Sequence, residues 1–150
     1  MADGPSTMTT PDPTIYTLDE AERTLPLVRR IVVDLQHEYA LWRAAVGQFE
    51  LISAGARAEE KFPPEVVVAE REVTILAERV AELLGELASI GCIAKGIEAG
   101  LIDFYALRDD RLVYLCWRLG EERITTWHDL DAGVDGRRPI DDLLSTGIIS

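Results

Sequence analysis

The chain has 150 residues, of which 47% are hydrophobic and 28% are charged, a balance that is typical of a folded globular protein and excludes the disordered and collagen-like classes. The 27 Asp and Glu residues against 15 Lys and Arg give a formal net charge of −12, which disfavours binding to a phosphate backbone. No segment approaches the roughly 18 continuous apolar residues of a membrane span, so we predict neither a nucleic-acid partner nor a membrane.

The N-terminal segment predicts a disordered leader over residues 1–16. Pro, Thr, Asp and Gly dominate its start, and it has neither the basic start nor the apolar core of a secretory signal. Cys92 and Cys116 are too few for a disulfide scaffold, so we expect free thiols and a cytoplasmic location. We expect residues 17–150 to form one domain.

The first predicted helix covers residues 18–53. Thr17 can accept a hydrogen bond from an early helical amide while Glu20 reaches back to the cap, which is the pattern of a capping box. Apolar residues then recur at spacings of three and four up to Phe49, the period of one helical face. Pro26 lies inside this segment and removes one backbone hydrogen bond, so a kink or a slightly later start stays open.

A second helix is predicted over residues 64–90. Gly55 and Pro63-Pro64 bracket a charged loop before it, and proline is favourable near a helix start. Its apolar residues recur at the same spacings, and Gly91 follows as a C-cap glycine would. Two such helices joined by a short loop predict an antiparallel helical hairpin.

The pattern changes to that of strands at Leu101. Aromatic and β-branched residues dominate two segments separated by Asp109-Asp110, which predicts a hairpin. A third strand follows a turn around Gly120-Glu121. We therefore predict an α+β fold in which a long antiparallel helical hairpin is followed by a small three-stranded antiparallel β-meander. The predicted strands are 101–107, 112–119 and 123–128, with an irregular tail over 129–150.

The length of the Gly120-Glu121 turn decides which residues of the last two strands share a face. A two-residue turn pairs Cys116 with Thr125 and puts His128 on the opposite face. A three-residue turn pairs Cys116 with Thr126 and puts Cys116 and His128 on one face. These two registers therefore differ in whether the thiol and the imidazole can meet.

We favour the two-residue turn because it keeps Ile124 on the apolar face. His128 then lies with Trp117 toward the helices, while Asp103 lies directly opposite Cys116 on the outer face. A carboxylate there raises the pKa of the thiol, which argues against a cysteine nucleophile. We predict a ligand site formed by the outer-face residues and by nearby aromatic and cationic residues: Asp103, Tyr105, Tyr114, Arg118, Trp117, Trp127 and Arg137.

Thiolate, imidazole and carboxylate groups around the last strand are also the usual ligands of zinc. Their spacing matches no zinc-finger pattern, so we predict no cofactor, with a zinc-type metal site as the alternative. That site would use Cys116, Glu121, His128 and Asp131.

The predicted helices are longer than the predicted sheet can cover. They extend roughly 40 to 50 Å, more than a three-stranded sheet of this size spans. Leu27, Ile31, Leu41 and Ala45 add apolar surface beside the main stripe of the first helix. Two hairpins could close a four-helix, coiled-coil-like bundle, so we predict a homodimer.

Several short segments are similar to those of a known family. They are Tyr16 to Ala21, Gly100 to Phe104 and Leu115 to Glu121, followed by Trp127-His128 and Gly136-Arg137. Across them the chain resembles DUF2203, a bacterial family of unknown function. The resemblance implies the same architecture and a bacterial origin, and it implies no reaction.

The sequence thus favours a dimeric interaction module that binds a protein partner or a small molecule at its sheet. A metal-dependent or general acid-base enzyme centred on His128 is the alternative, so whether the protein is an enzyme stays open. A purely structural protein is the third candidate.

Overall fold

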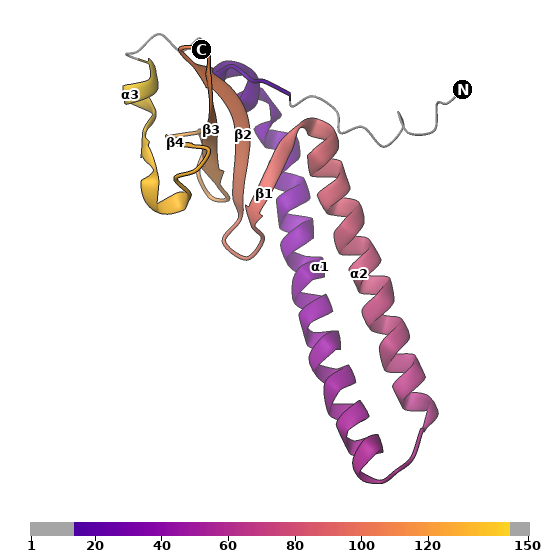
Figure 1. Ribbon diagram of the computed structural model, residues 1–150. Helices are drawn as coiled ribbons and strands as arrows, with labels where there is room; N and C mark the ends of the chain where they lie inside the picture. Colours follow the sequence, from indigo (N-terminus) through magenta and orange to yellow (C-terminus); the bar gives the residue numbers. More distant parts are fainter. Residues whose placement is uncertain (1–13, 145–150) are drawn as a thin grey trace, which may run out of the picture.

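In the computed structural model, two antiparallel helices form a long arm, and a sheet packs against one end of it (Figure 1). The first helix, α1 (Leu18–Ala58), begins at a capping box. The Glu20 amide donates to Thr17 Oγ1 at 3.1 Å, and the Thr17 amide donates to Glu20 Oε1 at 3.0 Å. The second helix, α2 (Pro64–Ile90), ends at Gly91, whose φ of 101° is left-handed. Among the described residues no helix has the length and apolar character that crossing a membrane requires.

Helix α1 is longer than the sequence predicts. It continues through Gly55 to Ala58, so the predicted end at residue 53 is wrong and the loop to α2 covers residues 59–63. An added Cβ at Gly55 would meet open space, and an exposed helical glycine costs only about 1 kcal/mol. The helix therefore continues past it, and Ala56 in the next turn is buried. Pro26 is also accommodated inside the helix.

Within the described part of the chain the sheet has five strands, so the prediction of three is wrong. Neighbouring strands are antiparallel throughout, in the order β1-β2-β3-β4-β5. The first strand is inconspicuous in the sequence because it directly follows the C-cap of α2 and ends in glycine. The last strand is only two residues long and includes a proline. The strands are β1 (Cys92–Gly96), β2 (Leu101–Arg108), β3 (Arg111–Arg118), β4 (Thr126–Asp129) and β5 (Arg138–Pro139), and the short helices η2 (Val134–Gly136) and α3 (Ile140–Leu144) flank β5.

The turn between β2 and β3 is the predicted Asp109-Asp110 turn. Both residues have positive φ, 49° and 68°, as a two-residue type I′ hairpin requires. Asp and Asn tolerate this conformation better than most residues, and the turn fixes the register of the two strands. Asp103 consequently lies directly opposite Cys116, as predicted.

The connection between β3 and β4 gives a register other than the favoured one. Cys116 pairs with Thr126 instead of Thr125. The favoured register assumed that Ile124 lies in a strand and faces the core from there. Ile124 is buried, but it lies in the loop before β4. Glu121 holds that loop: its carboxylate accepts from the Arg118 amide at 2.8 Å and from the Thr125 hydroxyl at 3.2 Å.

The main core lies between α1 and one face of the sheet. From α1 it takes Ala21, Leu25, Val28, Ile31, Val32 and Leu35, and from the strands it takes mainly Ile102, Phe104, Val113, Leu115, Trp117 and Trp127. Alternate strand residues point to opposite faces, so the residues between these core positions form the outer face.

The structure describes residues 14–144. Of the predicted leader, residues 1–13 lie outside this range, as does the end of the predicted tail, 145–150. Ile15 forms a parallel bridge with Tyr105, and Tyr16 packs edge-on against Phe104 with ring centroids 5.4 Å apart. The chain just before α1 is thus joined to β2.

Candidate functional site

Three polar side chains are buried together on the outer face of the sheet. Asp103 from β2, Cys116 from β3 and His128 from β4 are 0%, 1% and 3% exposed. Asp103 pairs with Cys116, and His128 pairs with Tyr114, two residues from Cys116. One donor atom from each of the three lies within 4.8 Å of the others. The prediction that His128 faces the helices beside Trp117 is therefore wrong, because the Thr126 register brings the imidazole to the thiol.

The His128 ring is held at both nitrogens. Nδ1 lies 2.9 Å from the Asp129 carbonyl oxygen, which can only accept, so Nδ1 carries a proton. Nε2 lies 3.1 Å from Asp103 Oδ2. The proton between Nε2 and Oδ2 belongs either to a neutral carboxyl group or to an imidazolium paired with a carboxylate. In both cases the ring is fixed with Nε2 directed at Asp103.

Burial dominates the acidity of the other two groups. It raises the pKa of Asp103, while His128, the Cys116 thiol and Lys95 oppose the shift. Burial, followed by the charge and hydrogen bond of Asp103, raises the pKa of Cys116 to about 11. At neutral pH Cys116 is therefore a protonated thiol, as the cross-strand carboxylate predicts. Such a thiol is not an activated nucleophile.

Aromatic residues and a lysine border these three groups. The Tyr114 ring lies 5.3 Å from the His128 ring and 5.0 Å from the Tyr105 ring, centroid to centroid. The Lys95 ammonium nitrogen lies 4.4 Å from the Tyr114 ring centroid, within cation–π range. A hydrogen bond with Tyr114, followed by burial, raises the pKa of Tyr105.

The predicted ligand residues divide between the two faces. Asp103, Tyr105 and Tyr114 lie together on the outer face. Trp117 and Trp127 are fully buried in the core on the other face, so they cannot join them. Two cations complete the predicted set: Arg118 is exposed at the end of β3, and the charge of Arg137 lowers the pKa of Cys116 against the effect of burial.

The predicted metal ligands are only partly brought together. Cys116 and His128 meet, but Glu121 holds the loop before β4 and Asp131 is exposed beyond it. Asp103 joins the thiol and the imidazole in their place. Its position opposite Cys116 was visible in the sequence, yet only the observed register adds His128 and makes the three groups one cluster.

The family model described as "Uncharacterized conserved protein (DUF2203)" matches residues 14–140, which span both long helices, all five strands and the buried cluster. The chain belongs to the DUF2203 family. The DUF2203 match confirms the resemblance seen in the sequence, and its description names no activity. No curated protein and no solved structure matches the chain.

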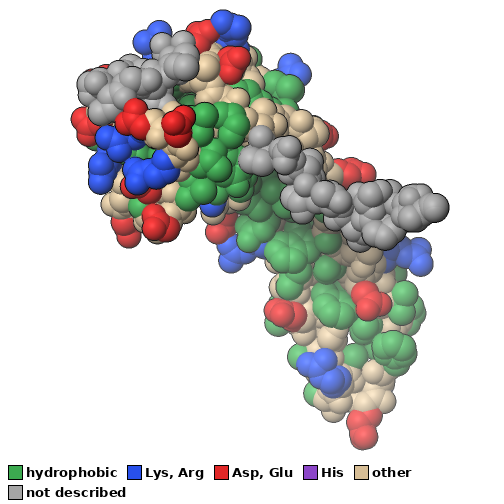
Figure 2. All heavy atoms as spheres, turned by 45° about the horizontal axis from the view of Figure 1, so that its top comes forward, with side chains coloured by type: hydrophobic (Ala, Val, Ile, Leu, Met, Phe, Trp, Pro, Cys, Tyr) green, Lys and Arg blue, Asp and Glu red, His purple; other side chains and the backbone are tan. Residues whose placement is uncertain are grey.

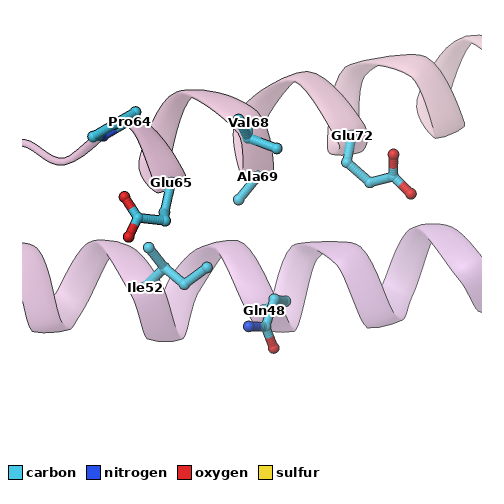
Figure 3. Close-up of a pocket in the computed structure, with 7 residues that line it drawn as sticks. All are labelled: Gln48, Ile52, Pro64, Glu65, Val68, Ala69 and Glu72. Carbon is cyan, nitrogen blue, oxygen red and sulfur yellow. The ribbon is translucent and has the colours of Figure 1, made fainter.

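A second surface of this DUF2203 chain is an apolar groove of about 580 Å³ on the arm (Figure 3). Gln48 and Ile52 of α1 form one side, and Val68, Ala69 and Glu72 of α2 form the other. The groove lies toward the end of the arm remote from the sheet, since it is bordered by the residues nearest the loop between α1 and α2.

Proposed function

We propose that the protein is a dimeric interaction module in which the arms of two copies pair into a four-helix bundle. The observation that carries this proposal is the apolar groove between α1 and α2, because it offers side chains that only a further element can bury. The absence of a thiolate nucleophile at Cys116 also favours a binding role over covalent catalysis.

The length of the arm supports this proposal. In the part of α1 that faces the sheet, the last buried residue is Leu35, and an ion pair between Arg43 Nη1 and Glu98 Oε2 at 2.5 Å lies farther along. Beyond Leu35 the helix continues to Ala58, about 35 Å at roughly 1.5 Å per residue. The sheet therefore leaves most of the arm uncovered (Figure 1).

Some of the exposed apolar residues lie on the face that carries the groove. Leu41 shares a helical face of α1 with the groove residues Gln48 and Ile52, and Ile75 shares one of α2 with the groove residue Val68. Val68 is 67% exposed and Ile75 is 40% exposed. Figure 2 shows hydrophobic side chains on the surface of the arm, with charged side chains scattered among them. Covering this face would remove apolar area from water, which stabilises association.

The area of this face fits a second copy of the chain. Two helices side by side are roughly 20 Å wide, so 35 Å of arm presents about 700 Å². A stable complex of standard size buries about 800 Å² per partner. A two-fold axis would bring the same groove of the second copy onto the first, so one surface serves both partners. The sheets would then lie outside the interface, and Tyr105 and Lys95 of the outer face would not take part in it.

Sedimentation velocity at micromolar concentration tests the proposal on the full chain. We expect the wild type to sediment as a dimer and the double variant Val68→Glu/Ile75→Glu as a monomer, because its glutamates would be buried against their symmetry mates. Both positions are exposed in the single chain, so circular dichroism should show unchanged helix content.

The matched control is Leu51→Glu/Val67→Glu. Leu51 and Val67 are 73% and 45% exposed, and each is one residue away from a groove residue, about 100° around its helix. We expect this variant to remain dimeric. A monomeric wild type, or equal dissociation of both double variants, would contradict the proposal.

A further inference from the structure

We propose that the outer face of the sheet binds a divalent transition metal ion, with zinc the best match, through Asp103, Cys116 and His128. This site is independent of the arm interface. It also differs from the ligand set that the sequence predicts, because Asp103 replaces Glu121 and Asp131. Three observations support it: the convergence of the donors, the orientation of the imidazole and the unpaired oxygen of the carboxylate.

The three donor atoms converge from three neighbouring strands. Zinc bonds of about 2.0 to 2.3 Å in tetrahedral geometry require donor atoms roughly 3.3 to 3.8 Å apart. Asp103 Oδ2 and His128 Nε2 are 3.1 Å apart, and all three donors, including Cys116 Sγ, lie within 4.8 Å of one another. Side-chain rotations that move the donor atoms by about 1 Å would complete the geometry. The strands that carry the ligands hold their backbone positions fixed.

The imidazole is oriented as metal-binding histidines are. Because His128 Nδ1 donates to the Asp129 carbonyl oxygen, Nε2 is the nitrogen directed at Asp103. A backbone carbonyl that fixes the tautomer of a ligating histidine is a common outer partner in zinc sites, where it also increases ligand basicity. The nitrogen that faces the cluster is thus the one able to bind the ion.

One oxygen of the Asp103 carboxylate is available to bind an ion. Its Oδ1 is buried and has no hydrogen-bond partner among the described residues. A metal ion would give the carboxylate a strong electrostatic partner, and Oδ1 or a water molecule could fill the fourth coordination position. The hydrogen bond between the Cys116 thiol and this carboxylate is weak, and it is lost when the sulfur binds an ion as a thiolate.

The charges of the three donors match a divalent ion. A carboxylate, a thiolate and a neutral imidazole together carry two negative charges, so the occupied site has no net charge in its buried position on the outer face of the sheet. Binding requires two protons to be released to solvent as the metal bonds form: the proton of the Cys116 thiol and the proton that Asp103 and His128 share. Mixed nitrogen, oxygen and sulfur donors suit zinc, and cobalt occupies the same kind of site.

Cobalt titration of untagged, chelator-stripped protein tests the site. We expect one equivalent of Co²⁺ to produce a cobalt–thiolate charge-transfer band and one equivalent of Zn²⁺ to remove it. Cys116→Ala should abolish the band, and Asp103→Asn should weaken Co²⁺ binding at least tenfold. Loss of the band in Cys116→Ala with an unchanged circular dichroism spectrum would assign the band to the Cys116 thiolate. A cysteine with a purely structural role would not give a cobalt–thiolate band.

Two variants serve as matched controls. Cys92→Ala removes the other buried thiol, while Asp131→Asn removes an exposed carboxylate that the sequence predicts as a ligand. Both should keep the band. If Cys116→Ala fails to fold, Cys116→Ser provides the second measurement, and it should keep the helix content by circular dichroism and lose the cobalt–thiolate band. No stoichiometric binding, or a band that Cys92→Ala removes, would overturn the proposal.

Discussion

His128 offers a direct test of how much the buried cluster stabilises the metal-free fold. We expect His128→Ala to lower the free energy of unfolding by about 3 kcal/mol in the presence of a chelator. The change removes the partner of Asp103 Oδ2 at 3.1 Å while Oδ1 has none among the described residues, and a buried unsatisfied carboxyl group costs about 1 to 3 kcal/mol. The cavity left beneath Tyr114 adds about 1 to 2 kcal/mol.

Urea denaturation followed by circular dichroism measures this cost. Asp103→Ala/His128→Ala should cost less than the sum of the two single variants, by about 1 to 3 kcal/mol, because each single change leaves the other group unpaired. His37→Ala is the matched control: His37 is the only other histidine, it is exposed, and its loss should change stability by less than about 0.5 kcal/mol. Equal costs at positions 37 and 128, or strict additivity in the double variant, would refute the coupling of Asp103 to His128.

Three further predictions concern the thiols, the interface and the hairpin turn. Burial raises the pKa of Cys92 to about 12 and that of Cys116 to about 11, so in chelator-treated native protein neither thiol should react appreciably with a disulfide reagent at mildly alkaline pH, and both should react in urea. The dimer dissociation constant measured by sedimentation should fall as salt rises, because each copy carries a net charge of −12 and salt screens their repulsion; a rise would indicate an interface of ion pairs. Asp110→Gly should raise the free energy of unfolding in urea by about 0.5 kcal/mol, since Asp110 has a φ of 68° that glycine adopts without strain; a loss of stability would contradict a type I′ turn.

Local signals predicted the helices and the central hairpin. α2 coincides with the segment between Pro64 and Gly91, because proline and glycine terminate a helix through their own backbone preferences. The Asp109-Asp110 turn likewise fixes the register of β2 and β3 locally. Gly55 led to a predicted helix end that is too early. An exposed glycine weakens a helix by less than the neighbouring residues stabilise it, so α1 continues past Gly55.

The complete site could not be predicted because it depends on a loop. Asp103 and Cys116 follow from the tight hairpin turn, but His128 joins them only through the longer connection before β4. There Ile124 enters the core from outside a strand, and Glu121 satisfies the loop by hydrogen bonds to Arg118 and Thr125. Alternation of apolar residues contains no information about such a loop, so it gave the wrong face for the imidazole.

The interface proposed for the arm and the metal site proposed for the sheet should be energetically separate. The groove lies beyond Arg43, whose ion pair with Glu98 joins the arm to the loop between β1 and β2, while the cluster lies on the sheet face turned away from α1. Distant sites that share no partners usually couple by less than about 0.5 kcal/mol. We therefore expect Val68→Glu/Ile75→Glu to keep the affinity for Co²⁺ within about threefold of the wild type, and Asp103→Asn to remain dimeric in sedimentation. If dissociation abolished metal binding instead, the arm and the buried cluster would be energetically coupled, which would contradict their separation.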